Sequence, residues 1–289
     1  MPVAEEGRDF AVLMRSFLDR ATVLSPITIS ALIYLARPLL RVHLAHYKRD
    51  VRHAPFPEDD PEFVIAGPHP DRLLFIGDVA VSGYGVLLQG MTTASQTARI
   101  LAQNRRRGCV WKTICATDLT AAHVARMPAF EAADVDVAVI MLGVPDVLLA
   151  TSLTTWAADL RTIADHIRQQ AGQDCGIVFA GIPPMADFRP IPPVARTMLM
   201  LQVQRLNRVT QVIASEIDAA YAPFPALRVG EMYVQELFSW KSLHEKWACI
   251  LAPATAQAMK QRRGAAQRRA ELAPTPITPP APPAPRRAH

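Results

Sequence analysis

The stretch LLFIGDVAVSGYGV, residues 73–86, combines an apolar run with the turn Gly77-Asp78 and a second turn of small residues. A side chain placed directly after Gly77-Asp78 would be well positioned to act as a nucleophile. That position holds Val79, whose side chain has no heteroatom and cannot attack a carbonyl carbon. The stretch therefore indicates the entrance to an active site that lacks its expected nucleophile.

Three further blocks hold side chains that could take part in acid-base or electrostatic chemistry. They are TDLTAAHV with Asp118, MLGVPDV with Asp146, and KSLHEKWA with His244. Histidine is the most frequent general base in enzymes, and a nearby carboxylate can orient it. Whether these blocks form one site depends on the elements that carry them.

Those elements follow from the apolar pattern. Four short apolar runs bounded by turn residues favour strands buried on both faces: RLLFIG, CVWKTIC, VDVAVIML and GIVFAG. After the third run, Ser152 or Thr154 can cap a helix, whose apolar stripe holds Trp156, Leu160, Ile163 and Ile167. A second stripe follows the fourth run, at Leu199, Val203, Leu206, Ile213 and Ile217. The alternation predicts an α/β fold with a parallel sheet between helix layers, and ligands in such folds bind beyond the carboxyl ends of the strands.

The composition indicates a globular protein, because 50% of its 289 residues are hydrophobic and can bury one sizeable core. The formal net charge is +5, but the residues from Lys260 onward contribute +6, so residues 1–259 sum to −1. The basic residues are therefore concentrated in a tail. Because the rest of the chain is not basic, the charge distribution argues against a nucleic-acid partner.

The cysteines Cys109, Cys115, Cys175 and Cys249 have no spacing typical of a metal site, and we expect free, mostly buried thiols. Free thiols favour a reducing compartment. The acidic residues within 5–9 differ from the basic start of a secretory signal. We therefore expect a cytoplasmic protein, peripheral to the inner membrane face if its N-terminal segment meets lipid.

Residues 1–70 form a predicted N-terminal segment and linker. The stretch 21–44 is strongly apolar, but Pro26, Arg37 and Pro38 interrupt it, which makes a membrane span marginal. Basic residues follow at Arg41, Lys48, Arg49 and Arg52. A helix lying on an anionic membrane surface fits this pattern, and a helix packed against the domain fits it equally well.

The predicted domain covers residues 71–260, and residues 261–289 form a tail. From Gly264 the tail reads GAAQRRAELAPTPITPPAPPAPRRAH, which is rich in alanine, proline and arginine. Such a composition buries too little apolar surface to offset the entropy of ordering. We therefore expect the tail to be disordered.

The order and spacing of the four blocks resemble those of the SGNH, or GDSL-type, hydrolases over residues 72–259. The stretch AGIPPMADFRPIPPVARTMLMLQVQRLNRV, with its proline-rich loop and following helix, is similar to a bacterial lysophospholipase-like subgroup. The resemblance implies a three-layer α/β fold with a flavodoxin-like parallel sheet. It also implies an ancestry among esterases and lipases.

The resemblance assigns a role to one position in each block. Val79 stands at the nucleophilic serine, and Pro145 stands at the asparagine that would donate to the oxyanion. The glycine of the oxyanion hole falls at Asp118 or, in a looser alignment, at Ala116. Lys241 replaces the aspartate of the triad, and His244 alone is retained, so it is expected to be vestigial.

Other residues near these positions have weaker alternatives. Ser82 could serve as a displaced nucleophile, although a hydrogen-bonding role at a helix start is favoured. Lys241 and the adjacent Ser242 would rarely face one another as a catalytic dyad.

The resemblance also implies that Asp78 and Asp146 accept loop N–H groups. Gly77 and Gly143 would shape those loops. We expect no metal, although binding of a cation by the two carboxylates stays an open alternative.

We therefore expect an SGNH hydrolase-like protein without esterase activity that acts in binding or regulation. An active esterase or lysophospholipase with a rearranged nucleophile is the first alternative, and a membrane-surface scaffold is the second. A small ester or lipid-like ligand and an anionic membrane surface are the expected partners. No cofactor is expected, and the identity of any protein partner stays open.

Overall fold

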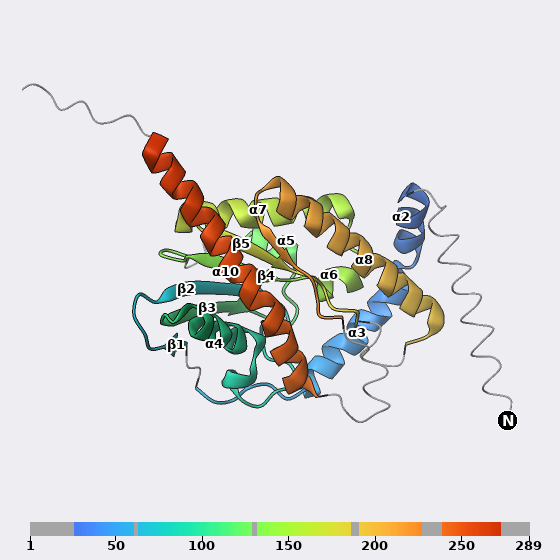
Figure 1. Ribbon diagram of the computed structural model, residues 1–289. Coiled ribbons are helices and arrows are strands. Elements are labelled where there is room, and N and C mark those ends of the chain that lie inside the picture. Colours follow the sequence, from blue (N-terminus) through green and yellow to red (C-terminus); the bar gives the residue numbers. More distant parts are fainter. Residues whose placement is uncertain (1–25, 61–62, 129–131, 186–190, 227–238, 273–289) are drawn as a thin grey trace, which may run out of the picture.

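One six-stranded sheet, in the order β1-β3-β2-β4-β5-β6, organises the part of the chain that the computed structural model describes (Figure 1). The described residues are 26–60, 63–128, 132–185, 191–226 and 239–272. The strands are β1 (Val64–Ile65), β2 (Asp71–Gly77), β3 (Cys109–Cys115), β4 (Val137–Met141), β5 (Gly176–Ala180) and β6 (Ala220–Ala222). The four apolar runs of the sequence correspond to β2, β3, β4 and β5.

The sheet is parallel from β3 through β6, which confirms the predicted fold class. The edge strand β1 pairs antiparallel with β3, so the complete sheet is mixed. Neither β1 nor β6 was predicted, because strands of two and three residues give too short a pattern to recognise.

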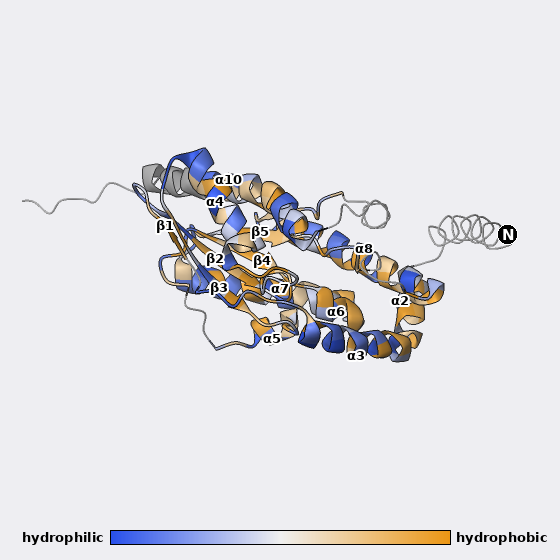
Figure 2. Cartoon of the chain, turned by 90° about the horizontal axis from the view of Figure 1, so that it is seen from below, coloured by the Kyte–Doolittle hydropathy of each residue, from blue (hydrophilic) through white to orange (hydrophobic). Residues whose placement is uncertain are grey.

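Helices cover both faces of the sheet and make the outer two layers. One face carries α5 (Ala121–Ala125), α6 (Val144–Leu148), α7 (Leu153–Ala171) and α8 (Pro193–Glu216). The other face carries α4 (Thr93–Arg105), which follows the short helix η1 (Gln89–Met91), and the long α10 (Trp240–Leu272). Figure 2 shows β4 and β5 coloured mainly as hydrophobic, between helices that carry many hydrophilic residues.

A hydrophobic core lies on each face of the sheet, and alternate residues of a strand pack into one core or the other. Leu74 and Ile76 of β2 pack against α5 to α8, whereas Leu73 and Phe75 pack against α4 and α10. This alternation follows from the pleat of a strand, and it requires apolar residues at every position of a strand covered on both sides.

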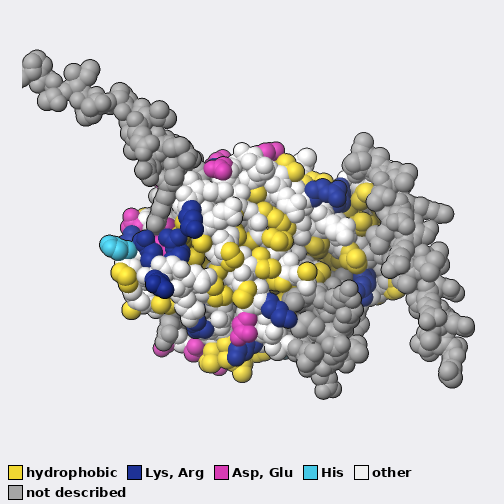
Figure 3. All heavy atoms as spheres, in the orientation of Figure 1, with side chains coloured by type: hydrophobic (Ala, Val, Ile, Leu, Met, Phe, Trp, Pro, Cys, Tyr) yellow, Lys and Arg dark blue, Asp and Glu magenta, His cyan; other side chains and the backbone are white. Residues whose placement is uncertain are grey.

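On the face seen in Figure 3, hydrophobic side chains also gather in the region between α10 and α8.

The N-terminal helices α2 (Pro26–Leu35) and α3 (Arg37–His53) pack against the same face as α8. Leu40 is fully buried, and the Arg37 guanidinium donates to the Ala150 carbonyl oxygen over 3.4 Å. The packed-helix alternative therefore applies to the described part of the apolar segment, while residues 21–25 lie outside it. No described helix is long and apolar enough to span a bilayer.

The helix α10 continues to Leu272, so the expected disorder from residue 261 is wrong for residues 261–272. The physical reason is local. Alanine, glutamine, arginine and glutamate dominate this stretch, all are strong helix formers, and extending an existing helix adds one hydrogen bond per residue. Residues 273–289, which hold the prolines of the tail, lie outside the described residues.

All four cysteines are free. Cys109 and Cys175 are buried as expected, but Cys115 and Cys249 are exposed. The expectation of mostly buried thiols is wrong for this pair, because Cys115 is the last residue of β3 and Cys249 lies on the outward side of α10.

Candidate functional site

The carboxyl ends of β2 and β4 meet at two glycines. A Cβ atom on Gly77 would lie 2.5 Å from the Met141 carbonyl oxygen, so only glycine allows the two strands to close here. Gly143 has a φ angle of 135°, and a Cβ atom there would lie 2.5 Å from the Ile182 side chain. Both residues therefore shape the loops on which the site is built.

Asp78 links the stretch 73–86 to the block MLGVPDV through hydrogen bonds. One carboxylate oxygen accepts the Ala80 N–H over 3.1 Å, and the other accepts the N–H groups of Gly143 and Val144 over 2.9 and 2.8 Å. The residue is 1% exposed. Burial raises the pKa of Asp78 to about 7, although the three N–H donors act in the opposite direction.

Asp146, which belongs to MLGVPDV, links this block to TDLTAAHV through hydrogen bonds. Its carboxylate accepts the Ala121 N–H over 3.1 Å and the Thr151 hydroxyl over 3.0 Å. Burial raises its pKa to about 6. The loop N–H groups occupy oxygens of both aspartates, and the described residues contain no group of three or more His, Cys, Asp or Glu side chains suited to a metal.

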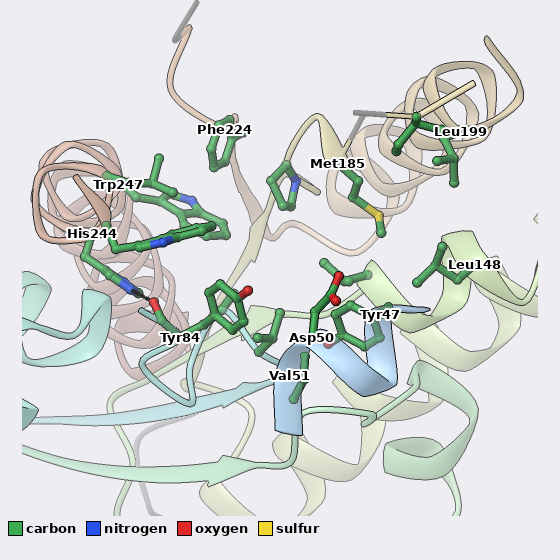
Figure 4. A pocket seen from close by; sticks show the side chains of 17 residues that line it. Tyr47, Asp50, Val51, Tyr84, Leu148, Met185, Leu199, Phe224, His244 and Trp247 are labelled. Carbon is green, nitrogen blue, oxygen red and sulfur yellow. Dashed lines mark hydrogen bonds between the residues drawn. The ribbon is translucent and has the colours of Figure 1, made fainter. Parts of the chain in front are cut away.

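A cavity of about 170 Å³ lies beside these loops (Figure 4). Its walls come from α3, the loop after β2, α6, the loop after β5, α8, the loop after β6 and the first two turns of α10. Tyr47 and Asp50 stand on the α3 side and His244 and Trp247 on the α10 side, while Val79 contributes to the wall near the end of β2. The walls are mainly apolar and aromatic, as in sites that bind small organic ligands.

His244 is 3% exposed and both of its ring nitrogens have partners. Nε2 lies 3.0 Å from the Tyr84 carbonyl oxygen, and Nδ1 lies 2.6 Å from the Thr93 hydroxyl (Figure 4 draws the first contact). A carbonyl can only accept, so Nε2 carries the proton and Nδ1 accepts from Thr93. Burial lowers the pKa of His244, which keeps the ring neutral.

This tautomer is opposite to the one that a serine hydrolase needs. In a catalytic triad, Nε2 is the unprotonated nitrogen that faces the nucleophile, and Nδ1–H is held by a carboxylate. Here Lys241 is exposed on α10 and lies 3.9 Å from the Glu245 carboxylate. Thr93 takes the place beside Nδ1 that an acidic residue would occupy.

Ser82 has a local partner. Its hydroxyl donates to the Asp78 carbonyl oxygen over 3.1 Å, and its N–H reaches the same oxygen over 3.2 Å. Ser82 does not line the cavity. Residues 79–85 form turns rather than the expected start of a helix, and the next α-helix begins only at Thr93.

The positions that the resemblance assigns to the oxyanion hole lie in different surroundings. Asp118 and Ala116 are exposed, and Asp118 lies 3.5 Å from the Lys48 ammonium, so its charge faces α3 rather than the cavity. Pro145 is buried within α6 and has no N–H. The neighbouring Val144 N–H already donates to Asp78.

Several residues of the site have no distinct sequence signal. Tyr47 of α3 donates to the Thr117 carbonyl oxygen and reaches the second block from 70 positions away. Thr93 likewise contacts the site through tertiary packing. No short motif relates Tyr47 or Thr93 to the four blocks, whereas Trp247 lies within the block KSLHEKWA together with His244.

Comparisons with known proteins agree with this fold. The chain matches the GDSL-like Lipase/Acylhydrolase family over residues 75–245. A structure described as a GDSL-like lipase from Parabacteroides merdae ATCC 43184 has a TM-score of 0.53 and 15% identity, covering 66% of this chain and 98% of that one. The lipase Lip_vut3 from a goat rumen metagenome has a TM-score of 0.52 and 12% identity, covering 64% and 97%. No curated protein sequence matches the chain.

Proposed function

The chain belongs to the GDSL-like lipase/acylhydrolase family, and from this premise we propose that it binds a small ester or lipid-like ligand beside His244 without hydrolysing it. One observation carries the proposal. The Nε2–H of His244 donates a hydrogen bond to the Tyr84 carbonyl oxygen. Nε2 therefore has no free lone pair with which to accept a proton from a group in the cavity.

The other missing groups support the same proposal. Val79 gives the ring no hydroxyl to deprotonate, and Pro145 gives a developing oxyanion neither a side-chain amide nor a backbone N–H. Catalytic groups of this kind act as a unit, and the loss of one costs orders of magnitude in rate. What is left is a frame of loops around an apolar cavity, which suits binding.

An active enzyme that uses Ser82 is the alternative. It would require the Ser82 hydroxyl to leave the Asp78 carbonyl and to reach His244. It would also require His244 to exchange both of its hydrogen bonds. Two rearrangements in a buried region make this alternative the weaker one.

We expect the protein to hydrolyse short-chain aryl esters at the rate of its His244→Ala variant, with no labelling by a serine-reactive fluorophosphonate. Val79→Ser restores a hydroxyl but leaves His244 without a free Nε2 and the oxyanion without donors. This variant is therefore also expected to stay at background. Hydrolysis that depends on His244, or labelling of wild type at Ser82, would contradict the proposal and favour the active enzyme.

A second candidate role is attachment to an anionic membrane surface, at the inner face of the cell membrane. The described part of α2 and α3 exposes three large apolar side chains, with exposed fractions of 63% for Tyr34, 74% for Leu35 and 52% for Val42. The outward side of α3 exposes the basic residues Arg41, Lys48, Arg49 and Arg52. Apolar and basic side chains on neighbouring helices favour an interfacial location.

The protein is expected to co-sediment with vesicles that contain anionic lipid, and to dissociate as salt rises, because each basic residue near such a surface contributes about 1 kcal/mol that salt screens. The double variant Arg49→Glu/Arg52→Glu is expected to lose most of this binding. Arg99→Glu/Arg106→Glu on the opposite helix layer changes the net charge equally and serves as the control. Equal loss in both variants, or no binding in wild type, would contradict a specific role of α3.

A further inference from the structure

A groove of about 520 Å³ lies beside α4, on the side where this helix packs against β1 and β3 (Figure 1). Ile65, Pro68 and Trp111 are among its apolar lining residues. The described residues that line the groove differ from those that line the cavity beside His244. Sites for small organic ligands typically have volumes of about 300–1,000 Å³. The groove is therefore a candidate for a second binding site.

Three arginines give the groove a positive charge: Arg99, Arg106 and Arg107. Arg99 lies on α4, and its guanidinium donates to the uncharged Gln96 side chain over 3.3 Å. Arg106 and Arg107 follow the helix directly and precede β3. A guanidinium group binds phosphate and carboxylate oxygens through paired N–H donors. The two neighbouring arginines at the end of α4 therefore have the chemistry of an anion site.

A buried carboxylate holds one of these arginines in place. Asp71 is 0% exposed and accepts two hydrogen bonds from the Arg105 guanidinium, over 2.5 and 3.2 Å. Arg107 Nε lies 3.3 Å from the same carboxylate and donates to the His69 carbonyl oxygen over 2.8 Å. One carboxylate thus meets two guanidinium groups. These contacts fix the position of Arg107 and leave positive charge over.

The charge balance of the groove stays positive when the opposing charges are counted. The carboxyl end of α4 carries a partial charge of about −0.5. Glu62 lies outside the described residues, and we count it as though it faced the groove. The arginines at positions 99, 105, 106 and 107, set against Asp71, Glu62 and the helix end, leave a net charge of about +1.5. Asp59 lies at the other end of α4, where it accepts the Gln89 N–H over 2.7 Å.

The backbone at the charged end of the groove is strained and tightly packed. Arg106 has φ 52° and ψ 44°, a left-handed conformation at the end of α4 that favours glycine. His69 in the facing loop has a φ of 44°. The two loops meet closely, since a Cβ atom on Gly67 would lie 2.5 Å from the Gly108 nitrogen. Strained residues of this kind cluster at ligand sites, and an arginine where glycine would avoid the strain indicates a use for its side chain.

We propose that this groove binds a small organic phosphate, with the phosphate on Arg106 and Arg107 and the apolar part of the ligand against Ile65 and Trp111. A phosphate group carries about −1.5 to −2 charges and three acceptor oxygens, which suits two adjacent guanidinium groups better than the single charge of a carboxylate. This site is separate from the cavity beside His244, so the two proposals succeed or fail independently.

The test is isothermal titration calorimetry with the full chain in a phosphate-free buffer of low ionic strength. Phenyl phosphate is expected to bind tightest, and its affinity is expected to fall as salt rises. Benzoate keeps the ring but has less charge, and is expected to bind about 10-fold more weakly, the difference that one charged hydrogen bond makes. Inorganic phosphate lacks the ring and is expected to bind about 3- to 10-fold more weakly than phenyl phosphate.

Variants of Arg106 separate a binding role from a structural one. Arg106→Gln is expected to lose about 10-fold in affinity for phenyl phosphate. The matched control Arg208→Gln removes the same charge from an exposed position on α8 and is expected to keep wild-type affinity. Arg106→Gly also relieves the positive φ, and is expected to lose the same affinity with a melting temperature no lower than that of wild type. Lower melting temperatures with unchanged affinity would show a structural role alone and overturn the proposal.

A vesicle experiment distinguishes a free phosphate from the phosphate of a lipid headgroup. Arg99→Glu/Arg106→Glu is expected to lose binding of phenyl phosphate and to co-sediment with anionic vesicles as wild type does. Loss of vesicle binding in this variant would assign the groove to a lipid headgroup and overturn a soluble ligand. Phenyl phosphate binding that persists in this variant, or no binding to wild type at millimolar concentration, would overturn the site itself. Benzoate that binds as tightly as phenyl phosphate would overturn the preference for phosphate.

Discussion

Replacing Asp78 with alanine is expected to lower the free energy of unfolding by about 3–5 kcal/mol, the cost of leaving three buried N–H donors without their acceptor. The three N–H groups of Ala80, Gly143 and Val144 all depend on this carboxylate. Water cannot replace it, because the residue is 1% exposed. Urea unfolding followed by circular dichroism at constant pH measures the loss.

The matched control is Asp118→Ala, which removes a carboxylate from the neighbouring block. Its ion pair with Lys48 joins two exposed side chains over 3.5 Å. Its removal is expected to change the unfolding free energy by about 0.5 kcal/mol or less. Equal losses in the two variants would mean that Asp78 does not hold the strand ends together.

The stability advantage of wild type over Asp78→Asn is expected to fall by on the order of 4 kcal/mol as the pH rises from about 4 to about 8. Burial raises the pKa of Asp78 from 3.8 to about 7 in the folded protein. Between these values the folded state binds more protons than the unfolded state, so the contribution of Asp78 is present below pH 3.8 and is lost as the pH rises through 7.

Taking the difference between wild type and variant removes the other buried groups from the measurement. Asp146, whose pKa is also raised, and His244, whose pKa is lowered, are common to both proteins. Unfolding free energies at a series of pH values give the slope. A difference that grows with pH would show that the three N–H donors outweigh burial and hold the pKa of Asp78 below its usual value.

The strand frame could be predicted because its signal is local. The run from Leu73 to Ile76 is apolar at every position, as a strand covered on both faces requires, and Gly77 marks its end. The placement of Val79 near the cavity followed from that frame. The start of α7 could also be predicted from a local signal. The sequence offered Ser152 or Thr154 as the cap, and the structure shows that the Ser152 side chain accepts the Thr155 N–H.

The state of His244 could not be predicted, because it depends on contacts that cross 151 and 160 positions of the chain. Thr93 looks like any helix-start residue in the sequence, and Tyr84 contributes only a backbone oxygen. The direction of Asp118 was equally hidden, since it is set by Lys48 on a helix outside the recognised blocks. Local pattern identifies the positions that the family resemblance assigns to the site, whereas tertiary packing determines which partners the side chains at those positions contact.

The helix α3 has two sides that the two proposed functions would use separately, and such an arrangement would link them energetically. Its inner side supplies Tyr47, Asp50 and Val51 to the cavity, and its outer side carries exposed basic residues. A ligand that holds α3 in place makes its displacement more costly, and a surface that displaces α3 weakens ligand binding by the same factor, because coupling between two binding events is reciprocal. A shortened protein that begins at residue 71 would have neither surface and would report on an open cavity.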